Sequence, residues 1–403
     1  MTEHTPRPTI GRTEFVALMA MLVATVAFSI DAMLPALPRI ASELSPEAPN
    51  HAQLVVTSFV FGMGVGTFLA GPLSDSYGRK PVVLWGSVLY VLACALAWAA
   101  TSLELVMLAR VLQGLGASAA RVVPMAITRD YYAGRGMARI VSFIMMVFTL
   151  VPAVAPLIGS FVIAYTGWRG LFGVFALFAL LSAAWLGLRV AEPLPKERRL
   201  PFRAKALKAA VSEVLAHPVV RLSTVIQTLC FVGIFASLST IHALFDTTYH
   251  RAESFPYWFC LIALVSGGFS LLNASLVMHL GMRRLVRLAM ATTILISLAM
   301  LAHIWLIGPL PFVLYLFWQT TIFVHTAMTL GNLNAIALEP MGHIAGTATS
   351  VFSALATVGS VMLTIPIGLA FDGTPVPLII GLLAVISLAY GLMHFLNESE
   401  DVE

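Results

Sequence analysis

Long apolar segments separated by short polar turns dominate the hydropathy pattern of this 403-residue chain. Each segment holds about 20 mostly apolar residues, the length at which an α-helix crosses the hydrocarbon core of a membrane. Helices suit that environment because they satisfy their own backbone hydrogen bonds. Twelve such segments are predicted, at residues 14–38, 51–73, 82–100, 104–127, 138–163, 170–190, 219–244, 255–279, 284–306, 310–333, 345–370 and 377–396.

The longest polar stretch, residues 192–217, divides these segments into two sets of six. We therefore expect an all-α membrane protein of twelve transmembrane helices in two pseudo-symmetric halves. The expected domains are an N-terminal six-helix half at 1–191, a basic cytoplasmic linker at 192–217 and a C-terminal six-helix half at 218–403.

Composition supports a membrane protein and excludes a soluble one. The chain is 59% hydrophobic and 10% charged, with a mean hydropathy of +0.92, whereas soluble domains carry roughly 25% charged residues. The three cysteines lie inside apolar segments, so they indicate neither a disulfide framework nor a metal site. The first apolar segment is longer than the apolar part of a signal peptide, and we interpret it as a retained span.

The distribution of positive charge predicts the orientation, because cytoplasmic loops carry an excess of Lys and Arg. With both termini in the cytoplasm, 18 of the 23 Lys and Arg residues fall on the cytoplasmic side, three fall outside and two lie within a span. The net charge of +4 is thus a topology signal and does not indicate a nucleic-acid partner. The cytoplasmic residues include Arg7, Arg12, Arg79, Lys80, Arg129, Arg189, Lys196 and Arg203.

A charged turn, Gly71–Pro81, joins the second and third segments. It contains Asp75, Gly78, Arg79 and Lys80, and Gly78-Arg-Lys recurs half a chain later as Gly281-Met-Arg-Arg. Repeated six-span halves are an architecture of transporters. We expect Asp75 to pair with Arg79 or Lys80 as a gating latch on the cytoplasmic side. The alternative is a charged turn that only connects two membrane helices.

Several motifs resemble one family. Gly71–Pro81 resembles the loop motif of the major facilitator superfamily, and residues 110–117 and 152–160 resemble its fourth-span motif and its fifth-span antiporter motif, the latter with Ala155 and Ser160 where glycines are usual. Shorter runs resemble the Bcr/CflA-type branch of drug:proton antiporters, which contains bicyclomycin and phenicol exporters. These runs are at residues 31–38, 129–132, 167–169 and 342–348.

The resemblance implies alternating access around a central cavity and proton-driven efflux of a small molecule. It also implies a multi-pass protein of the bacterial inner membrane that acts as a monomer. Two arginines within a span, Arg110 and Arg121, against one carboxylate, Asp31, disfavour lipophilic cations. We therefore expect neutral or mildly anionic amphipathic substrates, such as phenicol-like drugs or a metabolite.

Asp31 is the carboxylate that lies well inside a span, where a charge costs roughly 2.5–3.5 kcal/mol or more. By depth, Arg110 lies at the same level, so the two are expected to face each other as a proton-coupling pair. Burial favours the neutral acid and a nearby Arg favours the carboxylate, so changes in access can shift the balance. The alternative is a pair that only locks helices together.

Arg121 lies eleven residues after Arg110, on the same face of the helix, and Gln113 lies near that face. These residues either line the substrate cavity or, for Arg121, pair with Asp130. Other expected cavity residues are Phe28, Met146, Gln227 and Gln319, with core packing or interhelical hydrogen bonds as the alternatives. Expected bends or close-packing points are Pro35, Pro152, Pro156 and Gly159.

Other functions were weighed against export. Scattered His and Met residues leave open a same-fold importer of copper, a vitamin or a siderophore. The sequence offers no constellation of catalytic residues and no phosphate-binding loop, so we expect neither an enzyme nor ATP hydrolysis. A receptor is disfavoured by the short tails, and no cofactor or metal is expected.

Overall fold

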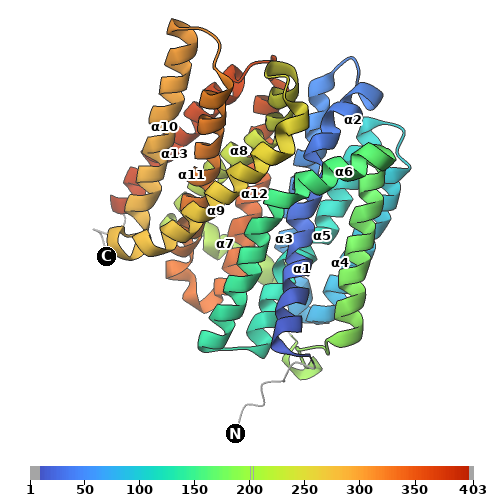
Figure 1. The fold of residues 1–403 in the computed structure, drawn as a ribbon. Coiled ribbons are helices and arrows are strands. Elements are labelled where there is room, and N and C mark those ends of the chain that lie inside the picture. Colours follow the sequence, from blue (N-terminus) through green and yellow to red (C-terminus); the bar gives the residue numbers. More distant parts are fainter. Residues whose placement is uncertain (1–9, 200, 203, 399–403) are drawn as a thin grey trace. The chain divides into compact units, whose positions relative to one another are not determined.

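The computed structural model describes residues 10–199, 201–202 and 204–398. These residues form helices and short connections, and no strand occurs among them (Figure 1). Arg7 and Arg203, both counted among the expected cytoplasmic charges, lie outside the described residues. The all-α expectation is confirmed.

The helices before the central linker are long and apolar except for α2, which has eight residues. A short 3₁₀ turn at Leu34–Ala36 separates the first two, and another at Pro49–Gln53 precedes the third. The helices are α1 (Arg12–Asp31), α2 (Leu37–Leu44), α3 (Leu54–Tyr77), α4 (Arg79–Trp98), α5 (Leu103–Tyr131) and α6 (Gly134–Arg189).

Helix α6 holds two of the expected spans. Its 56 residues are helical except at Gly167, where φ is 71° and ψ is 178°. A side chain rarely adopts this positive φ, so glycine lets two helices meet there without the longer loop that the sequence suggested. Eleven helical stretches among the described residues are long and apolar enough to cross a membrane. Dividing α6 at Gly167 gives the twelve expected spans.

After the linker, a short helix precedes six more apolar helices. A π-helical turn at Leu244–Thr248 ends the first of these six. The helices are α7 (Ala204–Ala216), α8 (Pro218–Ala243), α9 (Phe255–Leu280), α10 (Met282–Leu306), α11 (Phe312–Leu338), α12 (Ala345–Leu369) and α13 (Val376–Glu398).

The chain forms two compact units. Unit 1 contains residues 1–40 and 58–207, and unit 2 contains residues 41–57 and 208–403. Each unit has an apolar core of its own. One core includes Phe15, Val123 and Ile144 from α1, α5 and α6, and the other includes Ile226, Met290 and Ile386 from α8, α10 and α13.

Residues 41–57 follow the first span in sequence but belong to unit 2. The Asn50 amide donates hydrogen bonds to the carbonyl oxygens of Leu369 and Phe371, at 3.2 and 2.6 Å. These carbonyls lie at and just after the end of α12, where helix carbonyls lack partners within the helix. Thr248 holds the same loop by donating to the Gly373 carbonyl at 2.7 Å.

The charged turn between α3 and α4 is tighter than the Gly71–Pro81 stretch suggested. Helix α3 continues through Gly71 and Pro72 as far as Tyr77, and α4 begins at Arg79. Gly78 alone reverses the chain, with φ at 105°. A proline removes one helical hydrogen bond but does not always end a helix, so the Gly-Pro pair marked the turn several residues too early.

Candidate functional site

Asp31 is the last residue of α1 and is only 4% exposed. The next residue closes the helix, since the Ala32 N–H donates to the Phe28 carbonyl at 3.1 Å. In the part of the chain that the structure describes, the Asp31 carboxylate takes part in no hydrogen bond or ion pair. A buried, unpaired carboxylate at the negative end of a helix is unfavourable when charged.

Arg110 is fully buried on α5 and lies beside the same segment of α1. Its guanidinium donates to the Gln113 Oε1 at 2.6 Å and to the Ser29 carbonyl at 3.0 Å. It also lies over the Phe59 ring, 4.4 Å from the centroid. The expected match in depth with Asp31 is therefore present, but the guanidinium contacts neutral groups and forms no ion pair with Asp31.

Helix α4 completes this cluster through two residues that the sequence analysis missed. The Tyr90 hydroxyl lies 2.5 Å from the Ser29 Oγ, which donates to the Thr25 carbonyl at 2.6 Å. The Gln113 Nε2 donates to the Cys94 Sγ at 3.1 Å. Tyr90 and Cys94 are four residues apart on one face of α4, and that spacing of polar side chains in an apolar span was the available signal.

Arg121 lies further along α5 and has a different environment. Its Nη1 contacts the Met63 Sδ at 3.6 Å, and no carboxylate pairs with it among the described residues. The alternative partner, Asp130, bonds to Arg79 instead. Arg121 is therefore a membrane-depth cation whose contact within the protein is an uncharged thioether.

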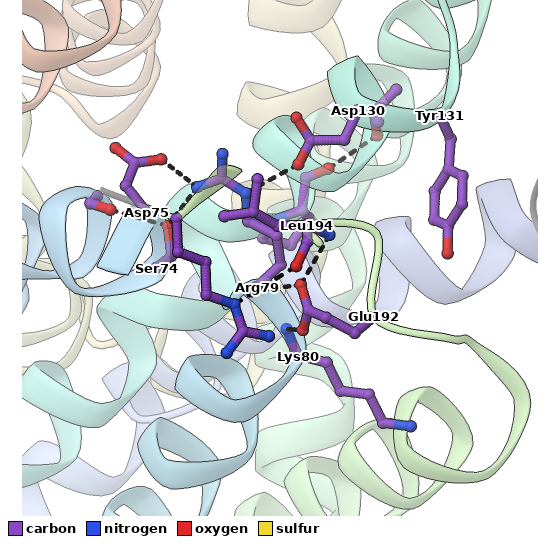
Figure 2. Close-up of polar contacts among 12 residues, drawn as sticks. Ser74, Asp75, Arg79, Lys80, Asp130, Tyr131, Glu192 and Leu194 are labelled. Atoms are coloured by element: carbon purple, nitrogen blue, oxygen red, sulfur yellow. Dashed lines mark hydrogen bonds and ion pairs between the residues drawn. The ribbon is translucent and has the colours of Figure 1, made fainter. Parts of the chain in front are cut away.

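The charged turn brings two carboxylates to one arginine. Arg79 is 5% exposed, and its guanidinium lies 2.5 Å from the Asp75 Oδ1 and 2.8 Å from the Asp130 Oδ2. It also donates to the Ser74 Oγ at 2.8 Å. Figure 2 shows the Arg79 side chain between Asp75 and Asp130. These bonds link the ends of α3, α4 and α5 within unit 1.

Glu192 joins the linker to this turn, and the sequence analysis did not single it out. Its carboxylate accepts hydrogen bonds from the backbone N–H groups of Arg79 and Lys80 at 2.9 and 2.8 Å (Figure 2). Lys80 donates to the Val190 carbonyl at 3.0 Å rather than to Asp75. An acidic group is favoured at a helix N-terminus. The sequence feature that could have pointed to Glu192 is the start of α4, where Gly78 has no side chain to cap the helix.

The second copy of the turn keeps part of this arrangement. Gly281 has φ 75° and ψ 157°, close to the values of 105° and 156° at Gly78. Arg283 then lies 3.9 Å from Glu339 at the end of α11, as Arg79 lies beside Asp130 at the end of α5. The second copy has Met278 in place of Asp75 but still forms this longer ion pair.

Four other residues were expected to line the cavity, and their surroundings in the structure differ from one another. Phe28 packs edge-on against Phe175, with ring centroids 5.3 Å apart. Gln227 donates to the Asn334 Oδ1 at 3.4 Å, and Gln319 donates to the Ser237 Oγ, so both join α8 to α11. Each of the two glutamines keeps a buried side-chain oxygen without a partner. Met146 is 50% exposed on α6.

Two of the residues expected at bends, Pro35 and Gly159, lie beside the end of α1. Pro35 lies in the 3₁₀ turn that follows α1, and Pro152 and Pro156 lie inside α6. A Cβ at Gly159 would collide with the Ala32 carbonyl oxygen. Glycine therefore lets α6 approach the backbone next to Asp31.

Comparison with known families identifies the chain. The model of the Major Facilitator Superfamily matches residues 18–364. The chain belongs to the major facilitator superfamily. This is a family of membrane transporters for small molecules, so the chain is a multi-pass transporter by family.

Two curated relatives match this superfamily member over nearly its whole length. A bicyclomycin resistance protein homolog of Haemophilus influenzae is 29% identical, covering 93% of this chain and 95% of the relative. A chloramphenicol resistance protein of Pseudomonas aeruginosa is 28% identical, covering 94% and 89%. These relatives fit the Bcr/CflA-type drug:proton antiporter branch that the motifs indicated.

Solved structures support the fold. A D-xylose-proton symporter superposes with a TM-score of 0.74 over 94% of this chain and 97% of that chain, at 16% identity. At that identity the match speaks for the fold alone. Among the described residues, no group of three or more His, Cys, Asp or Glu side chains is placed to hold a metal ion.

Proposed function

We propose that this transporter exports small neutral or mildly anionic amphipathic compounds, phenicol-like drugs or a metabolite, in exchange for protons. Support comes from the curated relatives, which are resistance proteins for bicyclomycin and chloramphenicol by name. The residues at 152–160 of α6, which resemble an antiporter motif, favour exchange over uptake.

The observation that carries the proposal is the buried, unpaired Asp31. A carboxylate in that setting needs either a proton or a cationic group to offset its charge. Arg110 is near but is bonded to the Ser29 carbonyl and to Gln113. A change in the packing of α1 against α5 would bring the guanidinium to Asp31 and release the proton, which couples the conformation to protonation.

The charged turn supports alternating access in this proposal. Arg79 and its two carboxylates tie the ends of α3, α4 and α5 together, so this part of unit 1 can move as one body during alternating access. In the proposed orientation this turn and the linker face the cytoplasm, both termini are cytoplasmic, and the monomer lies in the bacterial inner membrane.

The test is transport in proteoliposomes under an imposed pH gradient, with chloramphenicol as the probe. Asp31→Asn should abolish the acceleration by the pH gradient, because the amide cannot carry the exchanged proton. Asp31→Glu should keep part of it. Glu14→Gln is the matched control, since Glu14 lies on the same helix but pairs with Arg189 at its start.

If Asp31→Asn transports with an unchanged dependence on the pH gradient, Asp31 has no role in proton coupling. Wild-type protein that moves chloramphenicol down its own gradient alone would contradict antiport. Uptake driven in the same direction as the protons would indicate an importer.

A further inference from the structure

Arg121 is a cation for which the described part of unit 1 supplies no anion. Four carboxylates of unit 1 have other partners. Glu14 pairs with Arg189, Asp75 and Asp130 pair with Arg79, and Glu192 accepts from the start of α4. Asp31 forms no ion pair with Arg121 either. No carboxylate in the described part of unit 1 therefore pairs with this charge.

The side chain does not escape toward the nearer end of its helix. Arg121 lies ten residues before the end of α5 at Tyr131, and long cationic side chains near a helix end normally extend toward the membrane surface. Here the guanidinium contacts Met63 instead. The Met63 backbone nitrogen lies beside Gly114, seven residues before Arg121, so the Arg121 side chain points toward the middle of the helix and away from Tyr131.

This direction places the charge far from both ends of the span. At 1.5 Å per residue, the Arg121 backbone is about 27 Å from Leu103 and about 15 Å from Tyr131, and the side chain extends away from Tyr131. Helical side chains lean toward the N-terminus of their helix, so the conformation is unstrained. An arginine at that depth is expensive and is retained for function in most membrane proteins.

The cation also remains reachable. Arg110, eleven residues earlier, is fully buried and is held by oxygen acceptors on α1 and α5. Arg121 is only partly buried, and its guanidinium nitrogens are not among the enclosed polar atoms without partners. A guanidinium presents several donors in a plane that matches a carboxylate or similar anion.

We propose that Arg121 binds an anionic group of the transported compound and so makes the transporter selective for organic anions over matched neutral compounds. This inference rests on the proposed export function and assigns its substrate class. Arg121 is then a specificity-determining residue, while Asp31 couples transport to protons.

The experiment compares chloramphenicol with its hemisuccinate ester, which adds one carboxylate to the same scaffold. Both are measured in proteoliposomes with the full chain under an imposed pH gradient. Wild type should transport the hemisuccinate at least as well as chloramphenicol. Arg121→Gln should lower the ratio of anionic to neutral transport about tenfold or more, and Arg121→Lys should retain most of that ratio.

Met63→Leu is the matched control, because it removes the thioether contact but leaves the charge, and the ratio should stay unchanged. The inference is overturned if wild type carries chloramphenicol but not the hemisuccinate, or if Arg121→Gln lowers both equally. It is also overturned if wild-type chloramphenicol transport stops when chloride is replaced by gluconate, since chloride would then be the partner of Arg121.

Failure of the proposed function looks different. In that case wild type would transport neither compound in response to the pH gradient. Binding of the two compounds to the purified protein, followed by tryptophan fluorescence, then still decides the inference. Tighter binding of the hemisuccinate that is lost in Arg121→Gln supports it, and equal binding by both proteins overturns it.

Discussion

Tyr90 shows how single side chains fix the environment of Asp31. Its hydroxyl bonds to Ser29, and the Ser29 carbonyl accepts from Arg110. Two helices thus hold the backbone of α1 two residues before the unpaired carboxylate. Because all these groups are buried, each lost bond leaves a polar atom without water.

Tyr90→Phe removes the bond to Ser29 without changing the shape of the ring. We expect a loss of about 1–2 kcal/mol in stability, the typical cost of an unsatisfied buried hydroxyl. The measurement is the thermal unfolding midpoint of the purified protein in detergent. Tyr77→Phe is the control, because Tyr77 is 47% exposed, and an equal shift in both variants would contradict the role of Tyr90.

Sequence reasoning located the buried charges but not their partners. Asp31 and Arg110 were placed at one level by counting residues along two helices, and counting gives depth only. Which neutral groups surround Arg110 depends on the rotation and crossing of α1, α4 and α5, which hydropathy does not determine. Tyr90 and Cys94 were missed for that reason.

At the scale of elements, the start of α4 depends on Glu192 in the linker that follows α6. Gly78 has a conformation that reverses the chain, and it supplies no side chain to cap the new helix. Glu192 provides the missing acceptor from more than a hundred residues away. The linker is thereby attached to the charged turn as well as connecting the two six-helix halves.

Glu192→Gln tests this attachment. The amide has one acceptor oxygen and no charge, so one of two charge-assisted bonds is lost and the other weakens, at a cost of about 1–2 kcal/mol. We expect faster cleavage of the linker by trypsin in proteoliposomes and a lower unfolding midpoint. Glu197→Gln in the same linker should behave like wild type, since Glu197 is exposed.

Element boundaries were predicted well where apolar segments ended in charge and poorly where glycine or proline marked the end. The spans at 82–100 and 284–306 agree closely with α4 and α10. Gly71-Pro72 lies inside α3, and the loop expected near Gly167 is a single residue. Glycine and proline show which backbone conformations a segment can adopt, and helix packing determines which of these conformations it takes.

At the scale of the whole molecule, the orientation is a prediction of charge alone. Single cysteines near Gly78 and in the linker should be labelled by an impermeant maleimide from the cytoplasmic side. Cysteines near Ala48 and Gly308 should be labelled from the other side. The background would replace Cys94, Cys230 and Cys260, and labelling of both groups from one side would contradict the twelve-span topology.

Residues 41–57 carry a consequence for dividing the chain into fragments. The polypeptide passes between the two units three times, because this segment belongs to unit 2 while its flanks belong to unit 1. A fragment beginning at the linker would therefore lack the Asn50 amide that closes the end of α12. Two separately expressed six-helix halves would therefore each be incomplete folding modules, since the first would hold a segment that packs with the second.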